Sequence, residues 1–222
     1  MKLEELDTPA VLIDRRIAEA NLARAQAYAD KHHLALRPHI KTHKLPLFAK
    51  RQMELGAVGI TCQKIGEAEV MADAGLTDIF IPYNILGRAK LDRLHALHQR
   101  ITLSVTADSE TTIEGYAARF TDKGHPLPVL VECDTGAKRC GVQTPEEAVR
   151  LAQAIAAAPG LRFDGLMTYP PRNQLAEVNA WLTKAKALLA ESGLEARRIS
   201  NGGSPDFYSA AEVTAATEHR PG

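Results

Sequence analysis

Cysteine is scarce in this sequence, and the three that occur, Cys62, Cys133 and Cys140, are isolated from one another. An odd number of isolated cysteines supplies neither a disulfide framework nor a CxxC metal knuckle. A cytoplasmic location, where thiols stay reduced, is therefore the simplest interpretation.

Charge of one sign is not in excess, because Lys plus Arg and Asp plus Glu each number 27. This balance gives no reason to expect nucleic acid or an anionic membrane as a partner. Long apolar runs are missing as well, so no membrane span is predicted. The first residues, MKLEELDTPAVLID, combine acidic side chains with a short apolar run and do not resemble a secretory signal peptide.

What the chain does contain is an alternation of short apolar runs with longer, Ala- and Leu-rich amphipathic runs. This pattern indicates a parallel sheet covered on both faces by helices. Eight repeats predict an α/β fold, a (β/α)8 TIM-type barrel, as one domain over residues 1–222. The rival, a doubly wound open sheet, lacks its usual GxGxxG after an early strand. An additional strand, Pro9–Asp14, is expected to pair outside the barrel. The eight expected barrel strands are Leu34–Ile40, Ala57–Thr61, Asp78–Pro82, Ile101–Thr106, Pro128–Cys133, Phe163–Thr168, Arg197–Ser200 and Val213–Glu218.

Helix boundaries support the same alternation. Gly75, Gly160 and Gly193 stand where a left-handed residue would close a helix. In TPEE, Thr144 can cap a helix and Glu147 completes a capping box. The clearest expected helices are Ile17–Lys31, Lys64–Ala74, Ala89–His98, Glu146–Ala157 and Leu175–Glu191.

The end of the first expected strand carries the strongest chemical signal. In RPHIKTHK, alternation along a strand places Arg37, His39 and Lys41 on one face. Crowded cations are costly to desolvate unless an anion compensates, and a phosphorylated cofactor would supply that anion. The same crowding lowers the pKa of a lysine, and a neutral amine is the form that attacks an aldehyde. A solvated basic loop is the alternative interpretation, and Lys44, beyond the strand end, is a weaker candidate than Lys41.

Two later strand ends add candidates. The fifth strand runs into DTGAKR, where Gly136 permits a sharp turn and Arg139 reaches a loop beside the barrel mouth. Arg139 could bind a cofactor ring oxygen or a substrate carboxylate, or be an ordinary surface arginine. The sixth strand ends at Tyr169, which could stack on a flat cofactor or simply pack at the rim.

The seventh strand ends in SNGGSPD. Gly202 and Gly203 would let backbone N–H groups approach an anion, and Ser204 adds a hydroxyl. Any tight turn could use these glycines, but barrels often bind phosphate near their last two strands, so the position favours a phosphate site. Gln63 and the Tyr83–Asn84 pair, at the ends of the second and third strands, are weaker candidates for the same pocket.

Several segments together resemble one family. RPHIKTHK, ECDTGAKRCGV, GLMTY, SNGGSPD and EVTAATEHRPG, in this order, are similar to the D-threonine aldolase and D-serine dehydratase family. Its members are fold-type III pyridoxal 5'-phosphate (PLP) enzymes related to bacterial alanine racemase. The resemblance is to their N-terminal barrel and covers nearly the whole chain.

The resemblance implies roles for the candidate residues. Lys41 would hold PLP as a Schiff base, which makes it both a catalytic and a cofactor-binding residue. His39 would be a second catalytic residue of the pocket. The other cofactor-binding residues implied are Arg139 beside the ring, Tyr169 in the pocket, and Gly202, Gly203 and Ser204 around the phosphate.

Members of the family continue into a C-terminal β-domain that carries a His-x-Cys or His-x-Asp metal pair. Since this chain stops at Gly222, we expect it to lack that domain, the ligands for its divalent metal (manganese or zinc), and the partner strands of Pro9–Asp14. No metal ligand is assigned within the chain. We expect little turnover from it alone.

The resemblance implies a PLP-dependent lyase whose small-molecule substrate is a D-amino acid with a β-hydroxyl. Retro-aldol cleavage is favoured over elimination because GLMTYPP and PYNILG look closer to the aldolase branch. Two alternatives stay open: a single-barrel PLP-binding protein that manages cofactor levels, and an amino-acid racemase. No nucleic-acid or membrane partner is expected, and a homodimer is compatible with the resemblance.

Overall fold

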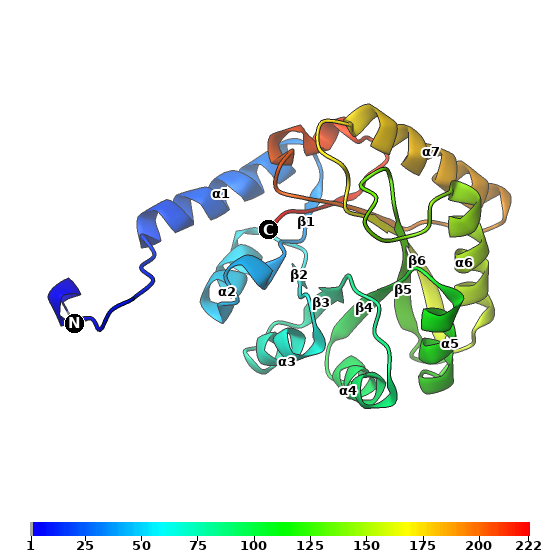
Figure 1. Ribbon diagram of the computed structural model, residues 1–222, viewed down its shortest axis with the longest axis horizontal. Helices are drawn as coiled ribbons and strands as arrows, with labels where there is room; N and C mark the ends of the chain where they lie inside the picture. Colours follow the sequence, from blue (N-terminus) through cyan, green and yellow to red (C-terminus); the bar gives the residue numbers. More distant parts are fainter. Residues whose placement is uncertain (1) are drawn as a thin grey trace.

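The centre of the molecule is a ring of parallel strands (Figure 1), seen in a computed structural model that describes residues 2–222. Each strand pairs in parallel with its neighbours, in the order β1-β8-β7-β6-β5-β4-β3-β2. Eight strands are found among the described residues, and they confirm the predicted barrel. They are β1 (Ala35–Leu36), β2 (Ile60–Thr61), β3 (Asp78–Ile81), β4 (Thr102–Ala107), β5 (Leu127–Cys133), β6 (Leu161–Thr168), β7 (Arg198–Gly202) and β8 (Glu218–Arg220).

Backbone hydrogen bonds between the segments around β1 and β2 close the ring. The Val58 N–H donates to the Leu36 carbonyl at 2.9 Å, and the Thr61 N–H donates to the Pro38 carbonyl at 2.8 Å. An isolated parallel bridge also joins His39 to Thr61. The two ends of the strand order are thus joined, which leaves no open sheet edge.

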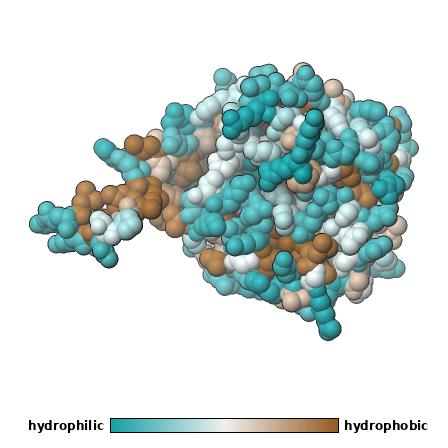
Figure 2. All heavy atoms as spheres, in the orientation of Figure 1, coloured by the Kyte–Doolittle hydropathy of each residue, from teal (hydrophilic) through white to brown (hydrophobic). Residues whose placement is uncertain are grey.

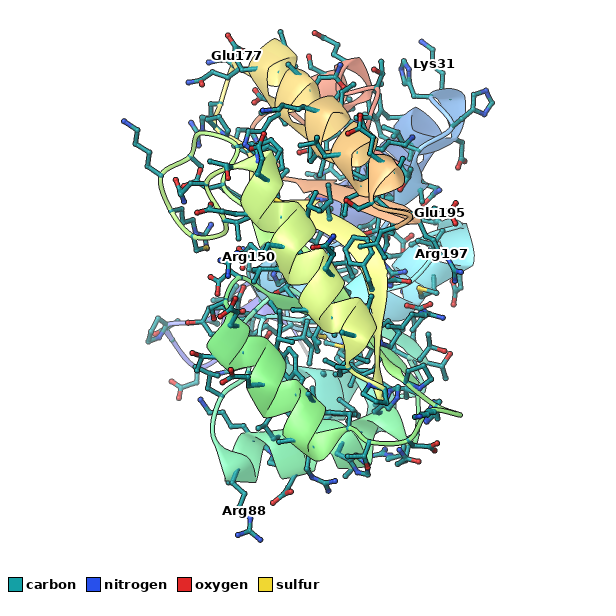
Figure 3. The ribbon with its side chains drawn as sticks, turned by 90° about the vertical axis from the view of Figure 1, so that its right-hand side faces the viewer. Lys31, Arg88, Arg150, Glu177, Glu195 and Arg197 are labelled. Carbon is teal, nitrogen blue, oxygen red and sulfur yellow. The ribbon has the colours of Figure 1, made fainter. Side chains whose placement is uncertain are left out.

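Helices cover the outside of the barrel, and α5, α6 and α7 lie side by side in Figure 3. The predicted capping box is present at α6, where the Thr144 side chain accepts the Glu147 N–H. Within residues 2–222 no helix combines the length and apolar composition needed to cross a lipid bilayer. The α-helices are α1 (Arg15–Lys31), α2 (Pro46–Leu55), α3 (Ile65–Asp73), α4 (Arg88–His98), α5 (Glu110–Arg119), α6 (Pro145–Ala157) and α7 (Leu175–Glu191); the 3-10 helices are η1 (Leu3–Glu5), η2 (Ile40–Thr42) and η3 (Phe207–Glu212).

The core has two parts because strand side chains alternate between the two faces of the sheet. The larger part, between strands and helices, is apolar. The inside of the barrel holds a small apolar cluster of Phe80, Leu130 and Met167. Beside this cluster lies a group of charged residues that we call the inner ion network: Arg37, Asp78, Asp164, Arg198 and Glu218.

Two sequence predictions fail at element boundaries. The first strand stops at Leu36, and the chain turns into η2 over Ile40–Thr42 instead of continuing to Ile40. The last strand is Glu218–Arg220 rather than Val213–Glu218. Val213 is apolar because its fully buried side chain packs at the end of η3, not because it lies in a strand.

The segment Pro9–Asp14 forms no strand in this structure and pairs with none among the described residues, so its expected pairing with partner strands beyond the barrel stays a prediction. Its apolar side chains are exposed; Val11, for example, is 94% accessible. The segment projects from the body of the barrel and carries the apolar surface at the left of Figure 2. Asp14, its last residue, caps α1 by accepting the N–H groups of Arg16 and Ile17.

Candidate active site

A cavity of about 310 Å³ opens at the carboxyl ends of the barrel strands. Loops that follow seven of the strands contribute to its lining, which is where barrel enzymes carry their chemistry. Most of the residues singled out in the sequence meet here. The lining includes Lys41, His39, Arg139, Tyr169, Gly203 and Ser204.

Lys41 reaches this cavity from the 3-10 turn η2 and not from a strand, which corrects the alternation argument. Burial, followed by the positive charges of Arg139 and Arg220, lowers the pKa of the Lys41 amine, although Glu67 opposes the shift. Lys44 does not line the cavity, and its amine pairs with Glu67 at 3.1 Å. Of the two lysines in the motif, Lys41 is therefore the one that combines a place in the cavity lining with a lowered pKa.

His39 prepares the turn on which Lys41 lies. Its Nδ1 accepts the Lys41 backbone N–H at 3.4 Å, so the ring caps η2. Its Nε2 lies 3.2 Å from Oε1 of Gln63, to which it can donate because Nδ1 is the acceptor. Burial, together with the charges of Lys41 and Arg220, lowers the pKa of His39 to about 3. The ring is therefore neutral at ordinary pH, with both nitrogens engaged.

Arg37 does not belong to the site, contrary to the shared-face prediction. It lies inside the barrel, where Nε is 2.7 Å from Glu218 and Nη1 is 2.5 Å from Asp78. Burial opposes its charge, but the two carboxylates outweigh burial and raise the pKa of Arg37. The anions that compensate Arg37 are thus supplied by the protein, so this residue provides no argument for an anionic cofactor.

Arg139 is brought to the cavity by a loop that Asp134 organises. The Asp134 carboxylate accepts the backbone N–H groups of Gly136 at 2.9 Å, Lys138 at 3.0 Å and Arg139 at 3.1 Å. These donors outweigh burial and lower the pKa of Asp134. The Arg139 guanidinium then lies over the Tyr169 ring, 4.8 Å from its centroid. A flat cationic and aromatic surface results at one wall of the cavity.

Arg220, which the sequence interpretation missed, is the most deeply buried cation in the cavity lining. Its Nη2 donates to the Thr168 carbonyl at 2.9 Å, and burial lowers its pKa to about 10. A Cβ on Gly202 would come within 2.5 Å of this guanidinium, so Gly202 makes room for Arg220 and does not itself line the cavity. Because the last strand was predicted too early, Arg220 was not recognised as a strand-end residue; the HRPG motif was the available signal.

Glu132 is a second residue that was missed, and it supplies the acidic group among the described residues of the lining. Burial raises the pKa of its carboxyl, whose Oε1 lies 3.1 Å from the Cys140 thiol. Its position at the carboxyl end of β5 was visible in the sequence. It was not selected because the motif that follows it, with Asp134 and Arg139, gave the stronger sequence signal.

The end of the cavity formed by the β7 and β8 loops combines small residues and a hydroxyl. The Gly222 N–H donates to Ser204 Oγ at 3.0 Å, and the same hydroxyl can donate to the Gly222 carbonyl. The Gly203 N–H donates to the Arg220 carbonyl at 3.3 Å. A Cβ on Gly222 would meet Thr42 at 3.0 Å, which shows how closely these loops approach one another.

Two of the three weaker candidates from the sequence lie in the cavity lining. Gln63 and Tyr83 line the cavity. Asn84 does not, because its Oδ1 accepts the Asp108 N–H at 3.2 Å and so fixes a neighbouring loop. Among residues 2–222, no group of three or more His, Cys, Asp or Glu side chains is arranged to hold a metal ion.

The fold and the cavity define a (β/α)8 barrel with a lysine-bearing cationic site at its carboxyl face. Residues 13–222 match the family described as alanine racemase, N-terminal domain, and the chain belongs to this family.

Comparisons with individual proteins agree with this assignment. The chain is 39% identical to a D-threonine aldolase of an Arthrobacter species, covering 95% of this chain and 59% of that protein. It is 36% identical to a 3-hydroxy-D-aspartate aldolase of Paracoccus denitrificans (strain Pd 1222), covering 94% and 57%. The crystal structure of D-threonine aldolase from Filomicrobium marinum superposes with a TM-score of 0.94 at 37% identity, covering 99% of this chain and 63% of that one. The chain thus spans about three-fifths of the length of these relatives.

Proposed function

We propose that this chain is the PLP-binding barrel of a lyase that acts on D-amino acids bearing a β-hydroxyl. The observation that carries the proposal is the Lys41 amine, whose pKa is lowered in a cavity that it shares with Arg139 and Arg220. The names of the similar proteins, D-threonine aldolase and 3-hydroxy-D-aspartate aldolase, supply the substrate class. They leave the chemistry of the substrate side chain open.

The residues of the cavity fit PLP at both of its ends. An amine with a lowered pKa is the form that attacks an aldehyde, and this supports covalent attachment of the cofactor at Lys41. The phosphate would be held where Ser204, Gly203 and Gly222 meet, and there the Ser204 hydroxyl and the Gly222 N–H would exchange the hydrogen bonds between them for bonds to phosphate oxygens. When bound, PLP supplies an electron sink for the substrate carbon next to the amine.

The remaining residues act on charge and orientation. Arg139 and Arg220 place fixed positive charge beside Lys41, which stabilises negative charge that develops on a bound ligand. Tyr169, beneath Arg139, offers an aromatic face to a flat ring.

His39 is better suited to positioning than to proton transfer. A pKa of about 3 leaves it without a proton to give near neutrality, and both nitrogens already have partners. Lys41, with its lowered pKa, is the more suitable group in the cavity to hold and release a proton. We therefore assign His39 the task of fixing the turn that presents Lys41.

Cleavage between Cα and Cβ requires loss of the β-hydroxyl proton, whereas elimination requires loss of the Cα proton. We favour cleavage. A divalent metal that engages the β-hydroxyl, with ligands in the additional length of the relatives, is part of this proposal, as are a cytoplasmic location and a homodimer.

The test is enantiomer selectivity. PLP-loaded protein is titrated with the D- and L-forms of threonine and serine while the cofactor absorption is recorded. We expect the spectrum to change with the D-forms at concentrations where the L-forms have no effect. Glycine plus aldehyde among the products would assign cleavage, and a keto acid would assign elimination. Equal responses to both enantiomers would contradict the proposed substrate class.

A further inference from the structure

The cavity holds more positive charge than its own residues neutralise. Four cationic side chains line it, Lys41, Arg139, Arg172 and Arg220, against the single carboxyl of Glu132 within the described residues. His39 adds no charge, since burial and the neighbouring cations lower its pKa to about 3. A site with this imbalance is built for a ligand with several negative groups.

Arg172 is the cation that the proposed function has not used. It lies in the loop between β6 and α7, directly after two prolines. The Asn173 N–H donates to Asp206 Oδ2 at 3.1 Å, and Pro171 lies against Gly136 of the neighbouring loop. The backbone that carries Arg172 is therefore fixed from both sides at the rim of the cavity.

The guanidinium of Arg172 has no ion pair among residues 2–222, unlike those of several exposed arginines on the outer helices. Arg93, Arg119 and Arg150 on the outer helices each pair with a carboxylate. Asp206 lines an adjacent small hollow together with Arg172, but its Oδ2 accepts the Asn173 N–H and it forms no ion pair with Arg172. Arg172 thus presents an unshared guanidinium to the cavity.

We propose that Arg172 binds a second carboxylate on the substrate side chain. This rests on the proposed function and narrows it, because the substrate would be a D-amino acid with a β-hydroxyl and a β-carboxylate rather than D-threonine. Lys41 is committed to the cofactor, Arg220 lies deep in the barrel, and Arg139 is stacked on Tyr169. The planar fork of Arg172 matches a carboxylate and stands at the rim, where a side chain would point.

The experiment uses two probes of the same shape, D-aspartate and D-asparagine, which differ in charge and lack the β-hydroxyl that cleavage requires. Their half-saturating concentrations are measured on PLP-loaded protein from the cofactor absorption. We expect D-aspartate to bind about tenfold more tightly, the effect of one charge-assisted contact. Arg172→Ala should abolish this preference, and Arg172→Lys should keep part of it. Arg88→Ala is the matched control, since Arg88 projects from α4 away from the barrel (Figure 3).

Three results would overturn the proposal. Equal affinity of the wild-type protein for D-aspartate and D-asparagine would show that no site for a second carboxylate exists. Loss of both probes alike in Arg172→Ala would assign Arg172 to the α-carboxylate. Weaker PLP uptake in Arg172→Ala, with the D-aspartate preference intact, would assign it to the phosphate. A wild-type chain that takes up no PLP before any amino acid is added would contradict the proposed function itself.

Discussion

Two groups of charged residues lie in the same barrel and differ in how their charges are neutralised. In the inner ion network, Arg37 and Arg198 face Glu218, Asp78 and Asp164 at short distances. At the mouth, the described residues place four cations around one carboxyl. A buried charge that finds its partner within the chain belongs to the architecture, whereas cations left without partners at strand ends indicate an anionic ligand. Arg37 and Lys41 are only four residues apart, yet they belong to different groups.

The largest expected effect comes from breaking the inner ion network. Glu218→Gln leaves Arg37 and Arg198 without their shared carboxylate, and it should lower the free energy of unfolding by about 3–5 kcal/mol. Urea denaturation measures the loss. The matched control is Glu110→Gln, which removes an exposed partner of Arg150 and should cost about 0.5 kcal/mol or less. Similar losses of unfolding free energy in Glu218→Gln and Glu110→Gln would mean that the inner ion network stabilises the fold no more than an exposed ion pair does.

A smaller effect follows from pH. The pKa values of His39 and His219 are lowered, chiefly by burial, to about 3 and about 4 from the ordinary 6.5. As pH falls below about 6.5, the unfolded chain takes up protons that the folded chain does not, so stability falls. At pH 5 each histidine should cost about 2 kcal/mol relative to pH 7. Glu218, whose pKa is also lowered, adds its loss only below about 4.5.

The check on this pH effect is a single substitution. Cofactor-free His219→Asn should lose about 2 kcal/mol less than the wild-type protein between pH 7 and pH 5. Denaturant midpoints at the two pH values give the comparison. An unchanged pH dependence in this variant would show that His219 is accessible to protons in the folded state.

The smallest effect on stability is expected at the mouth, where Asp134 organises the loop of Arg139. Asp134→Ala should cost about 1–2 kcal/mol, because three backbone N–H groups lose their acceptor. PLP affinity should fall by about tenfold, since Arg139 is no longer held toward the cavity. Asp134→Asn keeps one acceptor oxygen, so its stability and its PLP affinity should lie between those of the wild-type protein and Asp134→Ala. Fluorescence measures the PLP affinity, and urea denaturation measures the free energy of unfolding. An unchanged PLP affinity in Asp134→Ala would show that Asp134 does not position Arg139.

The sequence predicted the barrel well because strands buried on both faces read as apolar runs. The expected Pro128–Cys133 and the observed β5, Leu127–Cys133, differ by one residue. The strand boundaries were predicted wrongly where an apolar or alternating pattern arose from packing or from a turn and not from a strand. Val213 is apolar because it packs beside η3, and residues 37–41 alternate although the chain turns at Ile40.

The lining of the cavity was predictable where it coincided with a motif, as at Lys41, Arg139 and Ser204. Arg37 was misjudged because its partners, Asp78 and Glu218, are distant in sequence and only the closed barrel brings them to it. Arg220 was missed because the last strand was predicted too early, and Glu132 was missed because the motif that follows it was stronger. Burial inside the barrel depends on strand register, which composition does not specify.

The central claim is that Lys41, and no other lysine of the motif, holds the cofactor. Protein incubated with PLP is reduced with borohydride, digested, and mapped by mass spectrometry. The account predicts the label on Lys41, whose pKa is lowered in the cavity, and none on Lys44, whose amine pairs with Glu67. Lys41→Ala should abolish labelling and Lys44→Ala should retain it. A label on Lys44 or Lys64 in the wild-type protein would contradict the account.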